Sequence, residues 1–454
     1  MISRCSRRRF VQSMSLASLG YWTAGGIAPA ASRSANEKIN VAIVGAGGAG
    51  SSNTSCISHE RIVALCDVDE RRAGGAFKKH PDARTYKDFR KMLDEMDREI
   101  DAVVISTPDH VHGPASIKAL QMGKHVHCEK PMAHNVYECR LMVKLACEKD
   151  VVTQLGIEHN ASWHYMRMVE LVRAGVIGKV REAHCGQVRP SECVFPDDLE
   201  PRLLEESGRP KDTPPVPAGL DWDLWLGPAP WRPYHPAYCP NSWRVWRDFG
   251  TGFAGNFGCH MMDPAFTALE LKYPTTVEAT GKAVPYERCP AASARFQFPA
   301  RGELPPVTLY WHDHLTGPPA ELLEGETGTC LLVGDEGRIL VQHSRDEADP
   351  VLLPKAKFRD VKLPETKLPH AEAMRKGGHK GRHFHDLTDC IKSGGKTATD
   401  FALYSGPLGE AARLIHTAFY AGGKIDWDGE NMQITNLPDA NQYVGREYRK
   451  GWEL

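Results

Sequence analysis

Short apolar runs alternate with amphipathic stretches along the first third of the chain. The runs are rich in β-branched residues and lie at 39–45, 61–68, 101–107, 125–131 and 151–156. Continuous apolar runs of this length are typical of strands buried on both faces of a parallel sheet. Helical patterns lie between them, for example at 86–96 and 113–123. The alternation predicts a doubly wound α/β domain over residues 36–157.

The pattern changes after a further helical stretch at 162–178. Residues 190–240 hold twelve of the 32 prolines, and five of the ten tryptophans lie between Trp222 and Trp246. A long segment without periodicity is usually a functional loop, and its many aromatic rings argue against disorder. We therefore expect residues 190–248 to form an ordered arm that covers a pocket or a subunit interface.

Strand-like runs dominate residues 275–345, where no helical pattern intervenes. The last of them has a turn signal at 335–337, which predicts a hairpin. Two helical stretches follow, at 383–395 and 405–423, and each ends in glycine. Residues 158–454 are therefore predicted to form a second α/β domain with a mostly antiparallel sheet.

The first 35 residues have the character of an export signal. Arginines stand at 4, 7, 8, 9 and 33, no acidic residue occurs before Glu37, and a mildly apolar stretch follows the basic head. A basic head, an apolar middle and small residues at the end are typical of a secretory signal. The pair Arg7-Arg8 resembles the twin-arginine type, which predicts export of the folded protein to the periplasm or another extracytoplasmic space.

Size and composition exclude several classes of protein. A chain of 454 residues is too long for one compact core, which predicts two domains. The net charge of −1 gives no basic excess for nucleic acid, and no apolar run has the length of a membrane span. The 13 cysteines are scattered without a Cys-x-x-Cys pair, so we expect buried free thiols.

A glycine-rich loop follows the first strand. The segment "VGAGGAG" places glycines at the end of an apolar run and at the start of a helical one. In a dinucleotide-binding loop, Gly45 allows a sharp turn, Gly47 lets the backbone approach a pyrophosphate, and Gly50 lets the helix pack on the sheet. Gly48 lies in the same loop and is predicted to contact the cofactor as well. The loop predicts a Rossmann domain and binding of NAD or NADP.

An acidic residue completes this pattern at the end of the second strand. Asp67 lies where the ribose-binding carboxylate of the fingerprint is expected. A carboxylate accepts both ribose hydroxyls and repels a 2′-phosphate, which favours NAD over NADP. Arg71 and Arg72 lie nearby and weaken this preference, so NADP stays an alternative.

Two later strand ends reach the same edge of the predicted sheet. "STPDHVHG" follows the fourth strand, and we expect His110 and His112 to face the cleft there. "CEKPM" places Glu129 and Lys130 at the carboxyl end of the fifth strand. Ligands of open α/β sheets bind outside these ends. The predicted cofactor contacts are Gly45, Gly47, Gly48, Gly50, Asp67, Thr107, Pro108, His110, His112, Glu129 and Lys130.

Four motifs in this order carry a resemblance to a known family. "VAIVGAGGAG", "TPDHVH", "EKP" and "GNFGCHMMD" resemble the glucose–fructose oxidoreductase / inositol dehydrogenase (Gfo/Idh/MocA) family over about residues 38–450. Secreted twin-arginine members look most similar, including in "DWDLWLGPAP" and "REYRKGW". The resemblance implies a Rossmann domain followed by an α/β domain with a large antiparallel sheet, whose outer face often forms an oligomer interface.

The resemblance also implies catalytic residues. The family's catalytic lysine falls on Lys130, and its Asp-x-x-x-His motif falls on "NFGCH", so that the histidine is His260 and the aspartate position is Asn256. Asn256 is a departure from the family, because an amide can position a hydroxyl but cannot take its proton. Asp263 could instead orient the imidazole of His260, or lie on a helix surface.

The expected chemistry needs these residue types. Oxidation of a secondary alcohol moves a hydride to the nicotinamide while the hydroxyl loses a proton to a group with a pKa near the working pH. Histidine fits without adjustment, and lysine fits where burial lowers its pKa. We predict that His260 is the acid/base and that Lys130 holds the substrate hydroxyl and shares the proton transfer. Asn256 is predicted to position that hydroxyl.

The aromatic arm and its polar neighbours suggest the substrate. Tryptophan faces stack on the C–H faces of sugars, and polar side chains bind the hydroxyls. Burial of a subunit contact is the other interpretation of these tryptophans. The predicted substrate-binding residues are His159, Arg244, Trp246, Asp248 and Asn256.

Three His-x-His pairs were considered as metal ligands. They are His110/His112, His312/His314 and His383/His385. No neighbouring thiolate or acid has a zinc-enzyme spacing, so we expect no functional metal.

The leading hypothesis is an exported NAD(P)-dependent oxidoreductase that acts on a sugar, polyol or sugar derivative and keeps its cofactor bound. One alternative is an NAD-dependent glycosidase or lyase that acts by transient oxidation and elimination. A second alternative is a non-enzymatic sugar-binding module. The expected partner is a small carbohydrate, without nucleic acid or membrane, and a homo-oligomer, dimer or tetramer, is expected.

Overall fold

The computed structural model describes residues 37–186, 208–282, 284–313, 316–342, 348–368, 371–376 and 378–454. The predicted twin-arginine signal and the first part of the predicted arm, up to residue 207, lie outside these ranges. No helix in the described ranges combines the length and the hydropathy that a membrane span requires.

A six-stranded parallel sheet forms the N-terminal domain, in the order β3-β2-β1-β4-β5-β6. This order is that of a Rossmann fold. Its strands are β1 (Asn40–Val44), β2 (Arg61–Cys66), β3 (Arg84–Tyr86), β4 (Ala102–Ile105), β5 (His125–Glu129) and β6 (Thr153–Gly156). The five predicted runs correspond to five of these strands, and β1 and β4 to β6 are almost wholly buried.

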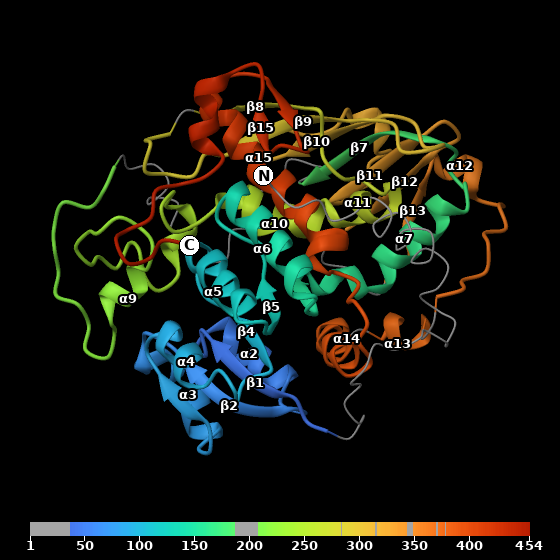
Figure 1. Ribbon diagram of the computed structural model, residues 1–454. Helices are drawn as coiled ribbons and strands as arrows, with labels where there is room; N and C mark the ends of the chain where they lie inside the picture. The colour runs from blue at the N-terminus through green and yellow to red at the C-terminus, as the bar shows by residue number, and fades with distance from the viewer. Residues whose placement is uncertain are drawn as a thin grey trace.

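Helices connect the parallel strands and cover both faces of the sheet (Figure 1). They are α2 (Ala49–Cys56), α3 (Glu70–Lys79), α4 (Phe89–Glu95), α5 (Asp109–Gln121) and α6 (Val136–Lys149). A helix from much later in the sequence, α14 (His379–Ser393), also packs on this domain, because Phe384 and Leu387 share a buried cluster with β1 residues such as Ile43.

The second domain contains a nine-stranded sheet in the order β13-β12-β11-β7-β10-β9-β8-β14-β15. All pairs are antiparallel except β7 with β10. The strands are β7 (Val180–Gly186), β8 (Thr276–Gly281), β9 (Ala292–Phe298), β10 (Val307–His312), β11 (Cys330–Gly334), β12 (Arg338–Val341), β13 (Val351–Leu353), β14 (Ile425–Asp428) and β15 (Gln433–Ile434). The predicted hairpin at 335–337 is the connection between β11 and β12. The predicted fold class is confirmed.

The remaining helices lie between the two sheets and around the second one (Figure 1). The α-helices are α7 (Trp163–Arg173), α9 (Trp222–Leu226), α10 (Gly252–Met261), α11 (Asp263–Leu269), α12 (Lys355–Phe358), α13 (Ala371–Arg375) and α15 (Gly406–Ala421). Short 3₁₀ turns are η1 (Glu158–Ala161), η2 (Ser242–Val245), η3 (Ala320–Leu322) and η5 (Pro438–Tyr443), and η4 (Phe401–Ser405) is a π-helical turn. Helices α10 and α15 pack together beside the carboxyl ends of the parallel strands, so α10 faces the cofactor edge of the Rossmann sheet.

Helix α5 begins earlier than the sequence pattern predicts. Asp109 occupies its first turn, where a carboxylate interacts favourably with the helix dipole, and Pro114 lies inside the helix. Pro114 has no N–H to donate to the His110 carbonyl, and the Arg446 guanidinium donates to that carbonyl instead, at 2.7 Å. This contact from the C-terminal tail allows the helix to contain the proline.

Candidate active site

The glycine-rich loop forms a cradle for an anion at the start of α2. Gly45 has a positive φ of 85°, and a Cβ there would lie 2.7 Å from the Ser106 carbonyl oxygen. A Cβ on Gly50 would lie only 1.7 Å from the Gly45 carbonyl oxygen. Within the described chain, no side chain caps α2 and no acid lies in its first turn. The helix N-terminus is therefore open to a phosphate group, which it would attract through its N–H groups and its dipole.

Asp67 lies beside this cradle at the carboxyl end of β2. Its carboxylate accepts hydrogen bonds from the backbone N–H groups of Gly47 and Asp69, both at 2.8 Å. Burial raises the pKa of Asp67, and the two backbone donors oppose that rise. The nearby Arg71 is turned away, because its guanidinium binds Asp69 at 2.6 and 2.8 Å. Arg72 stays at the cavity wall next to Gly48.

A partly open cavity extends from this cradle toward the second domain. Its Rossmann wall comprises Gly45, Gly47, Gly48, Asp67, Asp69, Arg72, Ser106, Thr107 and Pro108. Its opposite wall comes from the predicted arm: Leu224, Trp225, Cys239, Pro240, Asn241, Trp243 and Arg244. The described part of the arm thus covers the dinucleotide site.

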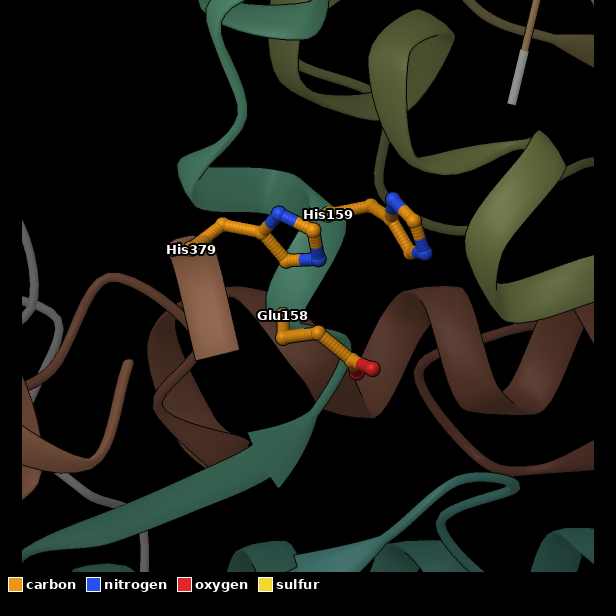
Figure 2. Close-up of side chains that lie close together, drawn as sticks. All are labelled: Glu158, His159 and His379. Carbon is orange, nitrogen blue, oxygen red and sulfur yellow. The ribbon is translucent and has the colours of Figure 1, made fainter. Parts of the chain in front are cut away.

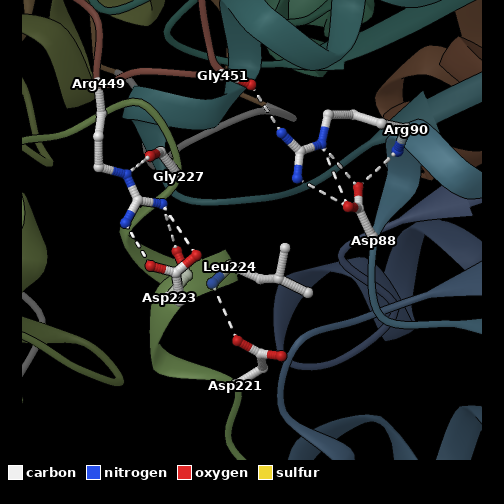
Figure 3. Close-up of polar contacts among 8 residues, drawn as sticks. All are labelled: Asp88, Arg90, Asp221, Asp223, Leu224, Gly227, Arg449 and Gly451. Carbon is white, nitrogen blue, oxygen red and sulfur yellow. Dashed lines mark hydrogen bonds and ion pairs between the residues drawn. The ribbon is translucent and has the colours of Figure 1, made fainter.

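The C-terminal tail fastens the arm to the Rossmann domain (Figure 3). Arg449 forms an ion pair with Asp223 of α9 at 2.5 Å and donates to the Gly227 carbonyl at 2.9 Å. Arg90 of α4 donates to the Gly451 carbonyl at 2.9 Å and lies 3.9 Å from the centre of the Trp452 ring. Trp452 itself lines the cavity. The tail therefore closes one side of the cofactor site.

His110 and His112 do not face the cleft, which corrects that expectation. Because α5 begins at Asp109, both rings are buried inside the helix packing, at 0% and 1% exposure. The His110 ring nitrogens lie 3.2 and 2.9 Å from the carbonyls of Phe249 and Trp225, so His110 holds the arm. Burial lowers the pKa of His110 to about 3, which keeps the ring neutral.

His112 links the two strand ends that carry the site. Its ring nitrogens lie 2.8 Å from the Thr107 carbonyl and 2.7 Å from the Pro131 carbonyl. The end of β4 is thereby held next to the Lys130-Pro131 segment, which has a cis peptide bond. Thr107 and Pro108 line the cavity, so His112 connects the cavity wall to the segment that carries Lys130.

Glu129 is held by Asn53, a buried residue of α2. The Asn53 amide donates to the Glu129 carboxylate at 2.8 Å and to the Ser106 hydroxyl at 2.9 Å. These bonds connect the glycine loop helix, β4 and β5 in one network. These bonds therefore hold the Glu129 side chain and the ends of β4 and β5 in fixed positions relative to α2.

Lys130 and Asn256, two of the three predicted catalytic residues, are in contact. The Lys130 amine donates to the Asn256 carbonyl at 3.0 Å and also contacts the Asn256 amide oxygen. His260 lies one helical turn further along α10 and is buried. Asp109 fixes the start of this helix, because it accepts a hydrogen bond from the Thr251 hydroxyl.

The environment of Lys130 lowers the pKa of its amine. Burial lowers its pKa, the carboxylates of Glu129 and Asp109 oppose that change, and the Arg244 guanidinium lowers the pKa further. A lysine with a lowered pKa can accept and return a proton near neutral pH. Arg244 also lines the cavity.

Asp263 does not lie on a helix surface. It is fully buried and accepts hydrogen bonds from Asn160 at 2.8 Å and Thr267 at 3.2 Å, and it contacts the Tyr404 hydroxyl. Burial raises its pKa to about 6. Asp263 supports η1, the turn that carries His159.

His159 lies in the site with a second group of ligand-type side chains (Figure 2). Its ring centre is 5.3 Å from that of His260 and 4.7 Å from that of His379. Ligand atoms of Glu158, His159 and His379 all lie within 4.8 Å of one another. Burial raises the pKa of Glu158, and the Glu129 carboxylate adds to that rise.

Two residues expected to bind substrate have other partners. Trp246 is 1% exposed, donates to the Ala237 carbonyl at 2.6 Å and is covered by Arg288, so its face is not open to a sugar. Asp248 is paired with Arg232 and lies 3.8 Å from Arg209. Both residues therefore build the arm. His159, Arg244 and Asn256 remain at the site.

Sequence patterns missed several residues of the site. Asn53, Asp109 and Trp452 act through contacts with segments far away in the chain, and no local spacing indicates them. His379 joins Glu158 and His159 only through the packing of α14 on η1. Periodicity and motif spacing describe one segment at a time, so such contacts leave no signal in them.

Both domains match models of one oxidoreductase family. Residues 39–157 match the Gfo/Idh/MocA family's NAD-binding Rossmann fold, and residues 207–287 match its C-terminal alpha/beta domain. Over these two segments the chain is similar to the Gfo/Idh/MocA oxidoreductase family. Its N-terminal domain is an NAD-binding Rossmann domain, which confirms NAD as the predicted cofactor.

Curated relatives are similar over part of their length. The chain is 32% identical over 151 residues to inositol 2-dehydrogenase from Rubrobacter xylanophilus, which is 32% of this chain and 43% of the relative. It is 30% identical over 151 residues to inositol 2-dehydrogenase 2 from Saccharopolyspora erythraea, which is 32% of this chain and 44% of the relative. The chain thus spans about half the length of these relatives or less.

Solved structures share the whole architecture. Levoglucosan dehydrogenase in complex with NADH has a TM-score of 0.56 at 17% identity and covers 86% of this chain and 99% of its own. Aldose-aldose oxidoreductase from Caulobacter crescentus has a TM-score of 0.54 at 15% identity and covers 86% of this chain and 100% of its own. At this identity the likeness supports the fold.

Proposed function

We propose that the protein is an NAD-dependent oxidoreductase that acts on a sugar, a polyol or a sugar derivative. One observation carries the proposal: the Lys130 amine lies 3.0 Å from the Asn256 carbonyl, with His260 one turn away on α10. His112 contacts both the carbonyl of Pro131, the residue after Lys130, and that of Thr107, which lines the dinucleotide cavity. The named relatives, inositol 2-dehydrogenases and levoglucosan dehydrogenase, support the substrate class.

The cofactor would be held by groups already in place. The open N-terminus of α2 suits the pyrophosphate, and Asp67 suits the ribose hydroxyls and so favours NAD over NADP. Thr107 and Pro108 would hold the nicotinamide end beside Lys130. When bound, the nicotinamide accepts or returns a hydride.

Residues of this chain bind the substrate hydroxyl and transfer its proton. Lys130, with its lowered pKa, binds the substrate hydroxyl and shares its proton, and His260 acts as the acid/base. The Asn256 amide orients the hydroxyl and the amine toward each other. His159 and Arg244 are in position to bind further hydroxyl groups.

The arm and the C-terminal tail over the cavity support the proposal that the cofactor stays bound. The arm and Trp452 cover the site, and Arg449 fastens them. We propose that the protein is exported by the twin-arginine route with its cofactor loaded. A retained cofactor suits a compartment without a nicotinamide pool, because oxidation of one substrate and reduction of another can recycle it.

The outer face of the nine-stranded sheet supports a homo-oligomer. Side chains alternate along β10, where Val307, Leu309 and Trp311 are buried while Thr308 and Tyr310 are half-exposed. A second copy could cover this face, as in a dimer or tetramer. Light scattering on the purified protein tests the proposal, and a monomer contradicts it.

One observation favours a second candidate function. Asn256 stands where the family has an aspartate, and an amide cannot take a proton as a carboxylate can. The net reaction can therefore differ from simple alcohol oxidation, for example redox-neutral cleavage of a glycosidic bond by transient oxidation and elimination. Free sugar released without a net change in nicotinamide absorbance would support this reaction. Binding of sugars without turnover would instead support a binding module.

A single-turnover sugar screen tests the proposed function. The purified protein is mixed with sugars and polyols, and reduced nicotinamide is followed by absorbance. We expect one substrate class to reduce the bound cofactor, and we expect Lys130→Ala or His260→Ala to slow that step about 10²–10⁴-fold at unchanged nucleotide content. Near-normal rates in both variants contradict the assignment.

A further inference from the structure

Glu158, His159 and His379 form a compact group that the proposed proton chemistry does not use. Glu158 and His159 come from η1, and His379 is the first residue of α14 (Figure 2). One ligand atom from each lies within 4.8 Å of the other two. All three side chains are half-buried.

The group lies beside the catalytic residues. Its turn η1 follows β6, whose last residue, Gly156, is paired with Glu129 next to Lys130. The His159 ring meets the His260 ring edge-on at 5.3 Å between centres. The charge of Glu158 acts on Lys130. A ligand held by this group would therefore touch the substrate side of the site.

The donor set suits a transition-metal ion. Two imidazoles and one carboxylate bind Zn²⁺, Fe²⁺ or Co²⁺ well, whereas Mg²⁺ and Ca²⁺ prefer oxygen ligands. Three protein ligands leave at least one position of a tetrahedral or larger sphere open, which is the arrangement of catalytic rather than structural sites. The positive ion would also offset the repulsion between Glu158 and Glu129.

We propose that Glu158, His159 and His379 bind one divalent transition-metal ion, and that its open position takes a hydroxyl or carbonyl oxygen of the sugar. The second half of this proposal rests on the proposed function. The ion would act as a Lewis acid that holds the substrate oxygen next to Lys130 and His260. The proposal departs from the sequence-based expectation that the protein has no functional metal.

The Lys380 amine, rather than a metal ion, could be the positive charge that balances the Glu158 carboxylate. Lys380 follows His379 directly and is a cation whose charge acts on Glu158, and its amine also lies 3.2 Å from the Ser52 hydroxyl. If Lys380 alone balances the carboxylate, the group needs no ion. Metal binding distinguishes the two explanations.

The test uses full-length protein purified without a histidine tag and washed with chelator. Co²⁺ and Zn²⁺ are titrated by calorimetry, Co²⁺ is followed by its visible absorption, and bound NAD is quantified in the same samples. The variants are His379→Ala and Glu158→Gln, of which the second keeps the shape of the side chain. His80→Ala, at the C-cap of α3, is a matched control with a half-buried histidine outside the group.

We expect one Co²⁺ or Zn²⁺ per chain in the wild type and in His80→Ala. Both ligand variants should bind the ion more than about 100-fold more weakly, which exceeds the 10–100-fold effect of losing an outer-shell partner. A sugar that reduces the cofactor should shift the Co²⁺ absorption.

Three results would overturn the proposal. If wild-type protein holds NAD but binds no Co²⁺ or Zn²⁺, the metal site is contradicted while the proposed function stands. Equal metal affinity in the wild type and both ligand variants contradicts the metal site in the same way. A bound ion whose spectrum ignores a proven substrate contradicts the substrate contact. Loss of NAD from wild-type protein would instead count against the proposed function.

Discussion

At the scale of single residues, Asn256 sets the charge next to the catalytic amine. An aspartate there would place a carboxylate against Lys130, which favours the charged amine and raises its pKa. We expect Asn256→Asp to move the rising limb of the kcat/KM–pH profile to higher pH by about 1–3 units. Asn256→Ala, which adds no charge, should leave the midpoint near its wild-type position, and the same midpoint in Asn256→Asp would contradict this role.

Asp67 is predicted to select the cofactor. Without its carboxylate the ribose hydroxyls lose their acceptor, and Arg72 at the cavity wall can meet a 2′-phosphate. We expect Asp67→Ala to weaken NAD binding about 10–100-fold, the value of a hydrogen bond to a charged group, and to improve NADP binding. Calorimetry on nucleotide-free protein measures both, and the exposed Asp82→Ala is the control. Unchanged selectivity would refute the assignment.

Asp263 predicts a pH dependence of stability. Its pKa is about 6 in the folded protein against 3.8 for the free side chain, so the folded state binds more protons in that window and loses stability as the pH rises through it. The difference corresponds to about 3 kcal/mol. We expect the free energy of unfolding of the wild type to fall between about pH 4 and pH 7. In Asp263→Asn this fall should be smaller by about 3 kcal/mol, measured by urea unfolding. Equal losses in both proteins would contradict the prediction.

At the scale of elements, the C-terminal tail is predicted to slow the release of the cofactor. Trp452 packs on Arg90, with its ring 5.9 Å from Phe89, and forms part of the cavity wall. We expect Trp452→Ala to raise the dissociation rate of NADH at least about tenfold, because changes in affinity act mostly on dissociation. Trp231, a tryptophan of the arm that is 66% exposed, provides the control Trp231→Ala. Equal rates in all three proteins would show that the tail does not retain the nucleotide.

The elements also show how far the sequence predicts the structure. Strands β1 and β4 could be predicted because they are buried on both faces and almost wholly apolar. Strands β5 and β6 are equally buried but also contain polar residues such as His127 and Gln154, which contact each other. Strand β3 is a short polar edge strand of three residues, and β7 pairs with β10 across more than a hundred residues, so neither leaves a clear local pattern. The start of α5 has no local signal, because Arg446, far away in the sequence, supplies the hydrogen bond to the His110 carbonyl that Pro114 cannot donate.

The same distinction applies to the site. The glycine loop, Asp67 and Lys130 lie at strand ends, where the fold itself brings them to one edge, and spacing therefore indicates them. Trp246 and Asp248 have residue types suited to a sugar, but packing uses them inside the arm. Residue type predicts what a side chain can bind, whereas its partners depend on tertiary contacts.

At the scale of the whole molecule, export with a loaded cofactor is predicted to depend on the arginine pair. We expect Arg7→Lys combined with Arg8→Lys to abolish the appearance of the protein in the exported fraction, because the twin-arginine route requires the pair. Arg4→Lys changes the same basic head outside the pair and should be exported normally. Fractionation followed by immunoblotting measures both, and export of the double variant at the wild-type level would refute the route.

The central claim is that an adenine dinucleotide occupies the cavity between the glycine loop and the arm, with its reactive end beside Lys130. The most direct test is to denature the purified protein and identify the released nucleotide and its redox state by chromatography and mass spectrometry. The account predicts close to one NAD or NADH per chain, converted from one form to the other by a sugar substrate in the wild type but not in Lys130→Ala. Protein that carries no nucleotide and binds none when NAD is added would contradict it.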